Sequence, residues 1–490
     1  MKRHDLISYS LVLLIGALLL MIIGCAAPKE DGKIPITTTS EKAREYYLQG
    51  RDLFEKLRAQ ESLQFFEKAV AEDSDFAMGY LYLSFAQPSA KGFFEKFDKA
   101  VALADKVSEG ERSWILGFEA GIHGFTMKQR ELYQELVEAY PNDERAHNLL
   151  GNHYFVQEDY ELAIEEYREA TRINPNFSQP YNQLGYAHRF LENYSEAEKA
   201  FKKYIELIPD DPNPYDSYAE LLMKMGKYDA SIESYQKALA LNPNFVPSHI
   251  GIATNLNFKG KHEKARQQLR KLYDMARNDG ERRAAHFAIS VSYVDEGNVD
   301  AALDEANKAY ALAEKINDAA AMAGDLAVMG DILVEAGRTD EALAKYEKAV
   351  EVAEASDLSE LVKDNARRGY LFHAARVALK KEDFATAKAK AEEYHKEVKI
   401  INNPFQIKLS HELAGMIALA EKKYDQALEK LQQASQQNPY NFYRMALAYQ
   451  GKGDAWKAKE FCSKAAKFNA LNSLNYAFIR NKAKQLLDSM

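Results

Sequence analysis

A pattern of apolar and small residues recurs every 34 positions through the middle of this chain. Counting Glu144 as position 1, Leu150 stands at position 7, Gly151 at 8, Ala163 at 20 and Pro175 at 32, and similar residues return 34 positions later. A repeat of about 20–50 residues is typical of proteins in which one small unit stacks on its neighbours. The period therefore predicts an elongated array.

Each unit is expected to form two helices joined by a short turn. Positions 4, 7, 8 and 11 fall on one face of a first helix, and positions 20, 24 and 27 on one face of a second. Small residues at positions 8 and 20 let the two backbones approach closely. Proline at position 32 ends the second helix because it has no N–H to donate. One such pair cannot bury its own apolar face, so neighbouring pairs must cover it.

The turn between the helices explains Gly226-Lys227, a pair that could suggest a phosphate loop. Glycine stands at the equivalent turn of four later units, at Gly260, Gly297, Gly337 and Gly453. Glycine provides the left-handed backbone conformation that is common where a helix ends. A phosphate loop would need an earlier glycine and a serine or threonine after the lysine, where this chain has Tyr228. The pair is therefore predicted to be a structural turn.

These positions resemble the consensus of the tetratricopeptide repeat family. The resemblance implies an all-α fold, a right-handed α-solenoid of about twelve helix pairs. We expect less regular repeats over 41–142, regular units over 143–280, C-terminal units over 281–471, some of them longer, and a capping helix over 472–490. The units are expected to begin near Ala43, Ala77, Gly110, Glu144, Ser178, Pro212, Val246, Arg283, Ala323, Arg368, Lys408 and Pro439.

The N-terminus is typical of a secretory signal peptide over residues 1–24. Lys2 and Arg3 precede an uncharged apolar run that ends at Gly24, and Cys25 follows. The Ile-Ile-Gly-Cys sequence resembles the lipobox of bacterial lipoproteins, which implies that Cys25 carries a lipid. The alternative is an uncleaved membrane anchor, because residues 6–24 are just long enough to span a bilayer. Residues 25–40 read as a flexible tether.

Composition and charge argue against several other classes of function. The formal net charge is −9 with no basic stripe, so nucleic acid is not an expected partner. The only other cysteine, Cys462, falls at a packing position, which favours a buried structural thiol over a nucleophile. His411-Glu412 begins like a zinc-protease motif, but Gly415 stands where the second histidine would be. We therefore expect neither a metal nor a cofactor.

The first helix of each pair lines the concave side in the tetratricopeptide repeat family. Amides there can pair with the backbone of an extended peptide, rings can take its side chains, and an arginine can meet a carboxylate. The alternative is that these side chains form a polar inner surface or contact the next repeat. The candidate groove residues are Asn148, Asn152, Phe155, Asn182, Gln183, Tyr186, Arg189, Phe190, Asp216, Glu220, Asn257 and Phe258.

The expected function is that of a non-enzymatic scaffold that binds proteins or peptides at the bacterial envelope. Because Ala26 follows Cys25, we expect the outer membrane, facing the periplasm. The alternative is a lipoprotein on such repeats that binds a solute or glycan. An enzyme is the third hypothesis. Its site would lie in the least regular stretch, residues 77–141, around His123 with Glu111 and Glu119.

Overall fold

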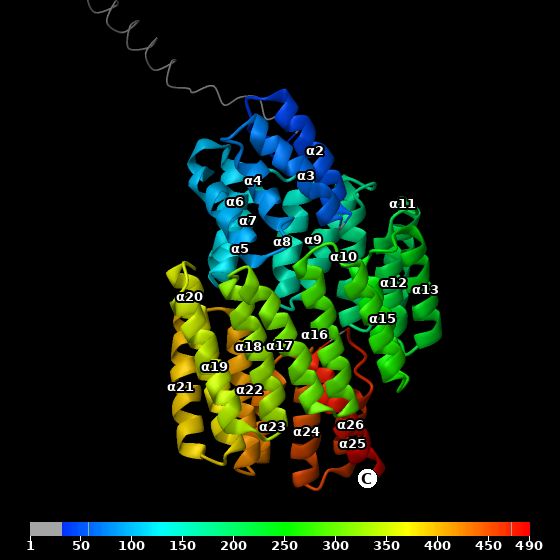
Figure 1. Ribbon diagram of the computed structural model, residues 1–490, viewed down its shortest axis with the longest axis vertical. Coiled ribbons are helices and arrows are strands. Elements are labelled where there is room, and N and C mark those ends of the chain that lie inside the picture. Colours follow the sequence, from blue (N-terminus) through cyan, green and yellow to red (C-terminus); the bar gives the residue numbers. More distant parts are fainter. Residues whose placement is uncertain (1–31, 57, 472) are drawn as a thin grey trace, which may run out of the picture.

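The computed structural model describes residues 32–56, 58–471 and 473–490, and every regular element in these residues is a helix. Helices α2–α25 form twelve consecutive pairs, and α26 follows them (Figure 1). The predicted all-α solenoid is confirmed. The predicted signal peptide and Cys25 lie outside the described residues. Within those residues, no helix combines the length and the apolar character needed to cross a membrane.

The first helices of the pairs are those with even numbers. The pairs are α2/α3 (Glu41–Glu55, Ala59–Glu72), α4/α5 (Ala77–Phe85, Ala90–Ala102), α6/α7 (Glu109–Ile122, Thr126–Ala139), α8/α9 (Glu144–Val156, Tyr160–Ile173), α10/α11 (Ser178–Phe190, Tyr194–Leu207), α12/α13 (Pro212–Lys224, Tyr228–Leu241), α14/α15 (Val246–Phe258, His262–Met275), α16/α17 (Asp279–Glu296, Val299–Lys315), α18/α19 (Ala319–Glu335, Thr339–Glu354), α20/α21 (Glu360–Lys380, Phe384–Ile401), α22/α23 (Pro404–Ala420, Tyr424–Gln433) and α24/α25 (Pro439–Gly451, Ala455–Ala466). The capping helix α26 spans Leu474–Asp488.

The longer units of the C-terminal half have longer helices rather than longer loops. Helix α20 has 21 residues and α21 has 18, whereas α8 has 13 and α9 has 14. The added residues extend the N-terminal ends of the first helices. Helices α16, α18 and α20 therefore begin four to eight residues before Arg283, Ala323 and Arg368, where the sequence places the start of each unit.

Close packing within each pair explains the small residue at position 8. A Cβ atom added at Gly151 would lie 2.6 Å from the ring of Tyr167, and one at Gly185 would lie 2.5 Å from the ring of Phe201. Tyr167 and Phe201 occupy position 24 of their units and are fully buried. Burial of such a ring contributes about 1.5–3 kcal/mol, and the missing side chain makes room for it.

Left-handed residues end the first helices, as the turn pattern predicts. Gly226 has φ = 76°, and the equivalent Glu158 and Glu192 take φ = 65° and 59° without being glycine. The lysine of the Gly226-Lys227 pair is the N-cap residue of α13. These residues form a structural turn.

Residues 33–39 lie along the helix ends of the first four pairs instead of projecting freely. The Ile34 N–H donates to Asp143 (2.8 Å), and the Thr37 N–H donates to Glu111 (2.8 Å). The Thr39 N–H donates to Asp73 (3.1 Å), and Lys33 forms an ion pair with Glu144. The flexible tether that the sequence predicts over 25–40 therefore does not extend through this part.

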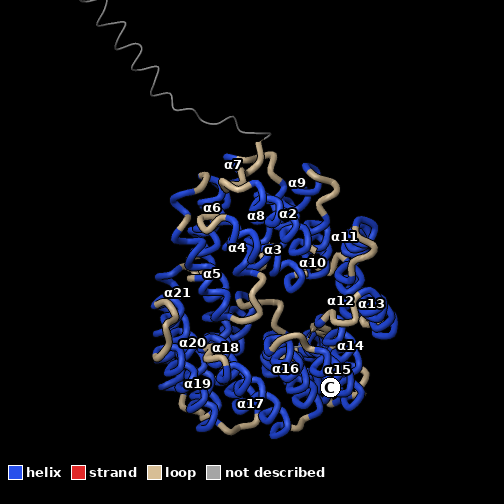
Figure 2. Tube along the Cα trace, turned by 45° about the horizontal axis from the view of Figure 1, so that its top comes forward, coloured by secondary structure: helices blue, strands red, loops and turns tan. Residues whose placement is uncertain are grey.

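The solenoid coils far enough to bring distant pairs together. The Asn278 side chain at the start of α16 donates to Gln60 of α3 (3.1 Å), so the eighth pair lies against the first. Asn403 donates to the Gly124 carbonyl (3.1 Å) across 279 residues. Figure 2 shows the same arrangement, with α18 beside α5. Two successive turns of the coil therefore meet along a seam.

Helix α26 contacts the inner side of the coil as well as the last pair. It packs against α24, α25 and α16 (Figure 1). The Tyr476 ring lies 5.1 Å from that of Phe258, and Arg480 donates to the Phe258 carbonyl (3.1 Å). Asn481 donates to the Asp295 carbonyl (2.9 Å), and Tyr476 is only 1% exposed. Helix α26 therefore covers the apolar face of the last helix pair and also links that pair to the preceding turn of the coil.

Candidate binding surface

Most of the predicted groove residues lie on the inner faces of α8, α10, α12 and α14, where they contact each other. Asn148 donates to Gln179 (3.0 Å), and Gln183 donates to Asn152 (3.1 Å). Each bond joins the first helices of successive pairs, 31 residues apart in the chain. The contact with the next repeat, which the sequence left open as an alternative, is therefore present.

Arg189, Glu220 and Tyr186 form a buried network on the same face. Arg189 donates to Glu220 (2.9 Å), and the Tyr186 hydroxyl donates to the other carboxylate oxygen (2.8 Å). Asp216 accepts a hydrogen bond from Ser248 (2.6 Å). Burial, together with the charge of Glu220, raises the pKa of Asp216 well above its usual value. Arg189 is thus already paired with a carboxylate of its own chain.

The remaining groove residues differ in their surroundings. Phe155 and Phe190 pack edge to face at 5.6 Å, and both remain partly exposed. Asn182 is buried, and its carbonyl oxygen has no partner among the described residues. Asn257 accepts from Ser292 (2.8 Å), and with Phe258 it lies beneath α26. These last two side chains are covered by the chain's own C-terminal helix.

A cavity of about 390 Å³ opens on the inner face of the first four pairs, and we call it the aromatic cavity. Asn148 and Asn152 lie on one side of it. Phe85 is central, with Phe118 4.7 Å away edge to face and Phe54 5.9 Å away in a stacked arrangement. Such ring pairs gain about 0.5–1.5 kcal/mol beyond the area that they bury. The aromatic residues that line the cavity are Phe54, Tyr82, Phe85, Phe93, Trp114 and Phe118.

Charged and polar side chains lie at the edge of the aromatic cavity and bind one another. Arg145 forms two hydrogen bonds to Glu55, at 2.8 and 3.0 Å, and a third to Glu144 at 2.8 Å. Although burial alone would lower the pKa of Arg145, these carboxylates raise it, so the guanidinium stays charged. The Asn148 carbonyl oxygen is buried and has no hydrogen-bond partner among the described residues. A buried acceptor without a donor costs about 1–3 kcal/mol, and because this oxygen is not accessible from the cavity, a bound group would reach it only after the Asn148 side chain moves.

The sequence prediction did not include the aromatic side of the cavity. It took the inward positions of the first helix only from the units that begin at Glu144 or later. Phe54 stands at position 12 of the unit from Ala43, Phe85 at position 9 of the unit from Ala77, and Phe118 at position 9 of the unit from Gly110. The same positions give Asn152 and Tyr186 in the regular units. Counting from the weaker units would have identified these rings.

A smaller pocket of about 290 Å³, the basic pocket, lies on the inner face of the C-terminal pairs. Arg376 donates to Asp331 (2.7 Å), and Arg444 donates to Glu412 (2.8 Å). Both carboxylates approach from outside the pocket lining. The charged residues that line the pocket are Arg376, Lys380, Arg444, Lys482 and Glu335.

The catalytic and metal-binding alternatives have no assembled site in the described residues. Glu111 is held by Thr37 and by the Ser108 N–H (3.1 Å) in a capping box. His123 is the C-cap residue of the same helix. Glu412 is held by Arg444. Within the described part of the chain, no three His, Cys, Asp or Glu residues are placed to hold a metal ion.

Comparisons with known proteins agree with this fold. A family model described as "TPR repeat" matches residues 151–189, and models described as "Tetratricopeptide repeat" match 178–211 and 219–245. None of the curated proteins matches the sequence.

Solved structures that match part of this chain include two of MamA and one of another repeat protein. The first MamA structure shares 21% identity over 34% of this chain and 91% of its own, with a TM-score of 0.29. A tetratricopeptide repeat protein from Parabacteroides merdae ATCC 43184 shares 15% identity over 56% of this chain and 94% of its own, with a TM-score of 0.36. From the family matches and the twelve helix pairs, this chain is a tetratricopeptide repeat protein.

Proposed function

We propose that this protein is a non-enzymatic scaffold that is anchored to the bacterial envelope by a lipid on Cys25 and binds an extended segment of a partner protein on its inner face. The tetratricopeptide repeats support protein binding as the general function. The aromatic cavity takes an apolar side chain of the segment, and the amides beside it take the backbone.

The observation that carries this proposal is the aromatic cavity itself, whose rings lie beside the side-chain amides of Asn148, Asn152 and Gln179. The amides pair with the backbone of the peptide, while one of its side chains fills the apolar space. Arg145 and Glu55 form an ion pair at the edge, so the cavity wall has no excess charge. We therefore expect the preferred segment to carry an aromatic or large aliphatic residue without a strong charge next to it.

Selection of short peptides from a random displayed library tests the binding function. We expect enrichment of segments with one large apolar residue and a loss of binding of about tenfold or more in Phe118→Ala. Phe405→Ala, which changes a ring that is 42% exposed on α22, is the control and should bind normally. Equal binding by both variants would contradict the proposal. Competition by an apolar solute without an N–H group would favour solute binding instead.

The anchoring part of the proposal needs a separate test. Cells that express the chain are labelled with a clickable fatty acid, and the envelope is then fractionated. We expect label on the protein and its recovery with outer-membrane fragments, and loss of both in Cys25→Ser. Cys462→Ser is the matched control, because Cys462 is fully buried. An unlabelled protein in the soluble fraction would overturn the anchor.

A further inference from the structure

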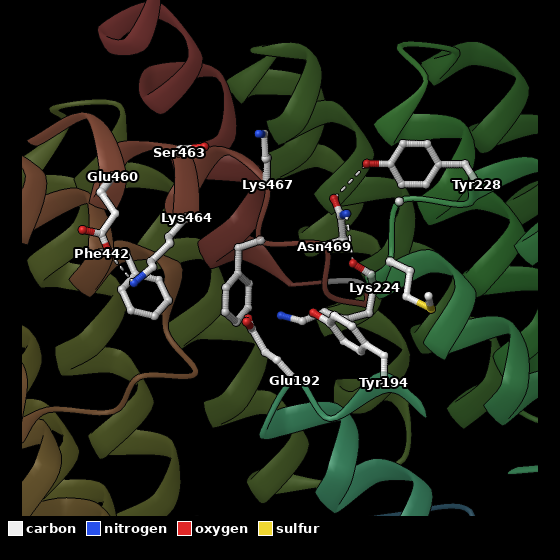
Figure 3. A pocket seen from close by; sticks show the side chains of 13 residues that line it. Glu192, Tyr194, Lys224, Tyr228, Phe442, Glu460, Ser463, Lys464, Lys467 and Asn469 are labelled. Carbon is white, nitrogen blue, oxygen red and sulfur yellow. Dashed lines mark hydrogen bonds and ion pairs between the residues drawn. The ribbon is translucent and has the colours of Figure 1, made fainter. Parts of the chain in front are cut away.

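A large hollow lies on the seam between the two turns of the coil. It measures about 830 Å³ and we call it the seam cleft. One side comes from the turns that join α10 to α11 and α12 to α13, with the adjoining helix ends, and the other from α24, α25 and the segment after α25 (Figure 3). At one end Tyr228 donates to Asn469 (2.9 Å), and Asn469 donates to the Lys224 carbonyl (3.4 Å). The cleft exists only because the chain coils back on itself.

Lys224 points into the seam cleft without a carboxylate partner. Its ammonium lies over the Phe468 ring, 4.0 Å from the ring centre. Glu192 attracts it, yet no ion pair joins the two groups, and the nearby Arg189 repels it. Arg189 and Arg444, two buried cations of the inner face, differ because each binds a carboxylate within 3 Å. Lys224 is thus a partly buried cation that forms no ion pair with an anion among the described residues.

The cleft lining combines rings with a small positive net charge, because three lysines, one of them Lys224, face Glu192 and Glu460. Phe468, Phe442 and Tyr194 supply flat apolar surface. Lys464 is already paired with Glu460 (2.8 Å), whereas Lys467 is exposed and has no ion pair among the described residues. A hollow of this size is in the range of about 300–1,000 Å³ that holds small organic ligands.

We propose that the seam cleft binds a small anionic molecule that carries a planar ring, with Lys224 as the partner of its anionic group. The ring packs between Phe468 and Tyr194, and the anion forms an ion pair with the Lys224 ammonium. Because the ligand touches both turns, its binding also fastens the last helix pair to the middle of the coil. This site is separate from the inner-face proposal, and either can fail without the other.

Burying the Lys224 ammonium without an ion pair destabilises the folded protein, and this cost supports a functional role for the lysine. Burial, with the charge of Arg189, lowers the pKa of Lys224 to about 8 despite the opposing effect of Glu192. A side chain that destabilises the folded chain in this way is typical of a binding site, where stability is given up for function.

The test uses 1-naphthyl phosphate as the probe and the mature chain as the protein. We expect saturable binding in calorimetry, and binding weaker by about tenfold or more for 1-naphthol, which lacks the phosphate. Lys224→Gln should lower the affinity by a similar factor. Lys348→Gln removes an exposed lysine that is paired with Glu351 on α19, and it should leave the affinity unchanged. Equal binding of naphthol, or an unchanged affinity in Lys224→Gln, would overturn the proposal.

A second measurement on the unaltered chain covers the case in which Lys224→Gln does not fold. Amines are acetylated under limiting reagent, and the rate at each lysine is followed by mass spectrometry. The probe should slow acetylation of Lys224 by about tenfold at saturation and leave Lys348 unaffected. Inorganic phosphate alone should protect poorly; protection equal to that of the probe would refute the role of the ring. A probe that protects no lysine would refute the site.

Discussion

Arg189 of α10 and Glu220 of α12 stand 31 residues apart, and their charged groups meet at 2.9 Å with both side chains only 10% exposed. The pair belongs to a series of polar contacts between the first helices of successive pairs, from α8 onward. Asn148 with Gln179 and Glu412 with Arg444 are other members. These contacts fix the rotation between successive pairs.

The Arg189–Glu220 pair gives the first prediction. Glu220→Ala leaves the guanidinium buried without its partner, so the free energy of unfolding should fall by about 3–5 kcal/mol at pH 7. Urea titration followed by circular dichroism measures this change. Glu196→Ala removes one partner of an exposed pair and should change stability by less than about 1 kcal/mol. Replacing both buried residues, in Arg189→Met with Glu220→Leu, should recover most of the loss.

Glycine at position 8 gives the second prediction. Gly185→Ala places a Cβ atom 2.5 Å from the fully buried ring of Phe201, and this overpacking should cost about 1–3 kcal/mol. Gly324 lies inside α18 with no atom within 4 Å of an added Cβ, so Gly324→Ala should stabilise the chain by about 0.5–1 kcal/mol. Thermal unfolding of both variants checks the opposite signs. A loss of stability in both would contradict the packing argument.

The capping helix gives the third prediction. Tyr476→Ala removes a ring that is 1% exposed and contacts Phe258, and should destabilise the chain by about 3–5 kcal/mol. Because this helix fastens the last pair to the preceding turn, amide hydrogen exchange in α25 and α26 should speed up more than in α8. Gln485→Ala on the exposed side of α26 is the control. Uniform acceleration along the chain would argue against a local role.

The helix pairs could be predicted because their determinants are local. Gly151 and Tyr167 lie 16 residues apart, and the requirement for a small residue beneath a ring is visible in the sequence. The coiling could not be predicted, because the contact between Gln60 and Asn278 joins two polar residues 218 positions apart with no repeating pattern. The seam cleft is a consequence of that coiling, so no motif indicates it.

The sequence placed the candidate groove residues on the first helices, and their role in peptide binding stays a prediction. Asn148 and Asn152 do line a cavity, whereas Asn257 and Phe258 lie under α26. A single first helix determines which residues point inward, but the occupant of that surface depends on where the end of the chain returns. Sequence periodicity does not contain this information, since α26 departs from the repeat.

The N-terminal segment gives a fourth prediction, on acid stability. Burial alone would raise the pKa of Glu144, but Lys33, the helix N-terminus, Arg145 and Asn174 together lower it to about 2. A carboxyl with a lowered pKa in the folded state stabilises the protein above its ordinary pKa near 4.5. This contribution, about 2–3 kcal/mol, is lost as the pH falls through 2. Glu144→Gln should therefore flatten the pH dependence of the urea midpoint between pH 5 and 3. Glu196→Gln, exposed and without these partners, should flatten it less.

Lys224 gives the last prediction, on stability at alkaline pH. The charged and titratable groups that face it are Arg189, Glu192, Tyr194, Tyr228, Glu460, Lys464 and Lys467. Its folded-state pKa of about 8 lies below the ordinary value of 10.5, so the unfolded chain binds more protons between these two values. The free energy of unfolding should therefore rise with pH from about 8 to 10.5, and the contribution of this group should be constant below that window.

Replacing the lysine isolates this contribution. Lys224→Met removes the charge but keeps the stem on Phe468, so it should stabilise the chain at pH 7 by about 1–3 kcal/mol. The gain over the unaltered chain should shrink as the pH approaches 10.5, because the lysine is then neutral in both states. Adding 1-naphthyl phosphate at pH 7 should stabilise the unaltered chain and not the variant, since the anion restores the missing ion pair. A variant that is less stable than the unaltered chain at pH 7 would mean that the ammonium already has a stabilising partner in the folded protein.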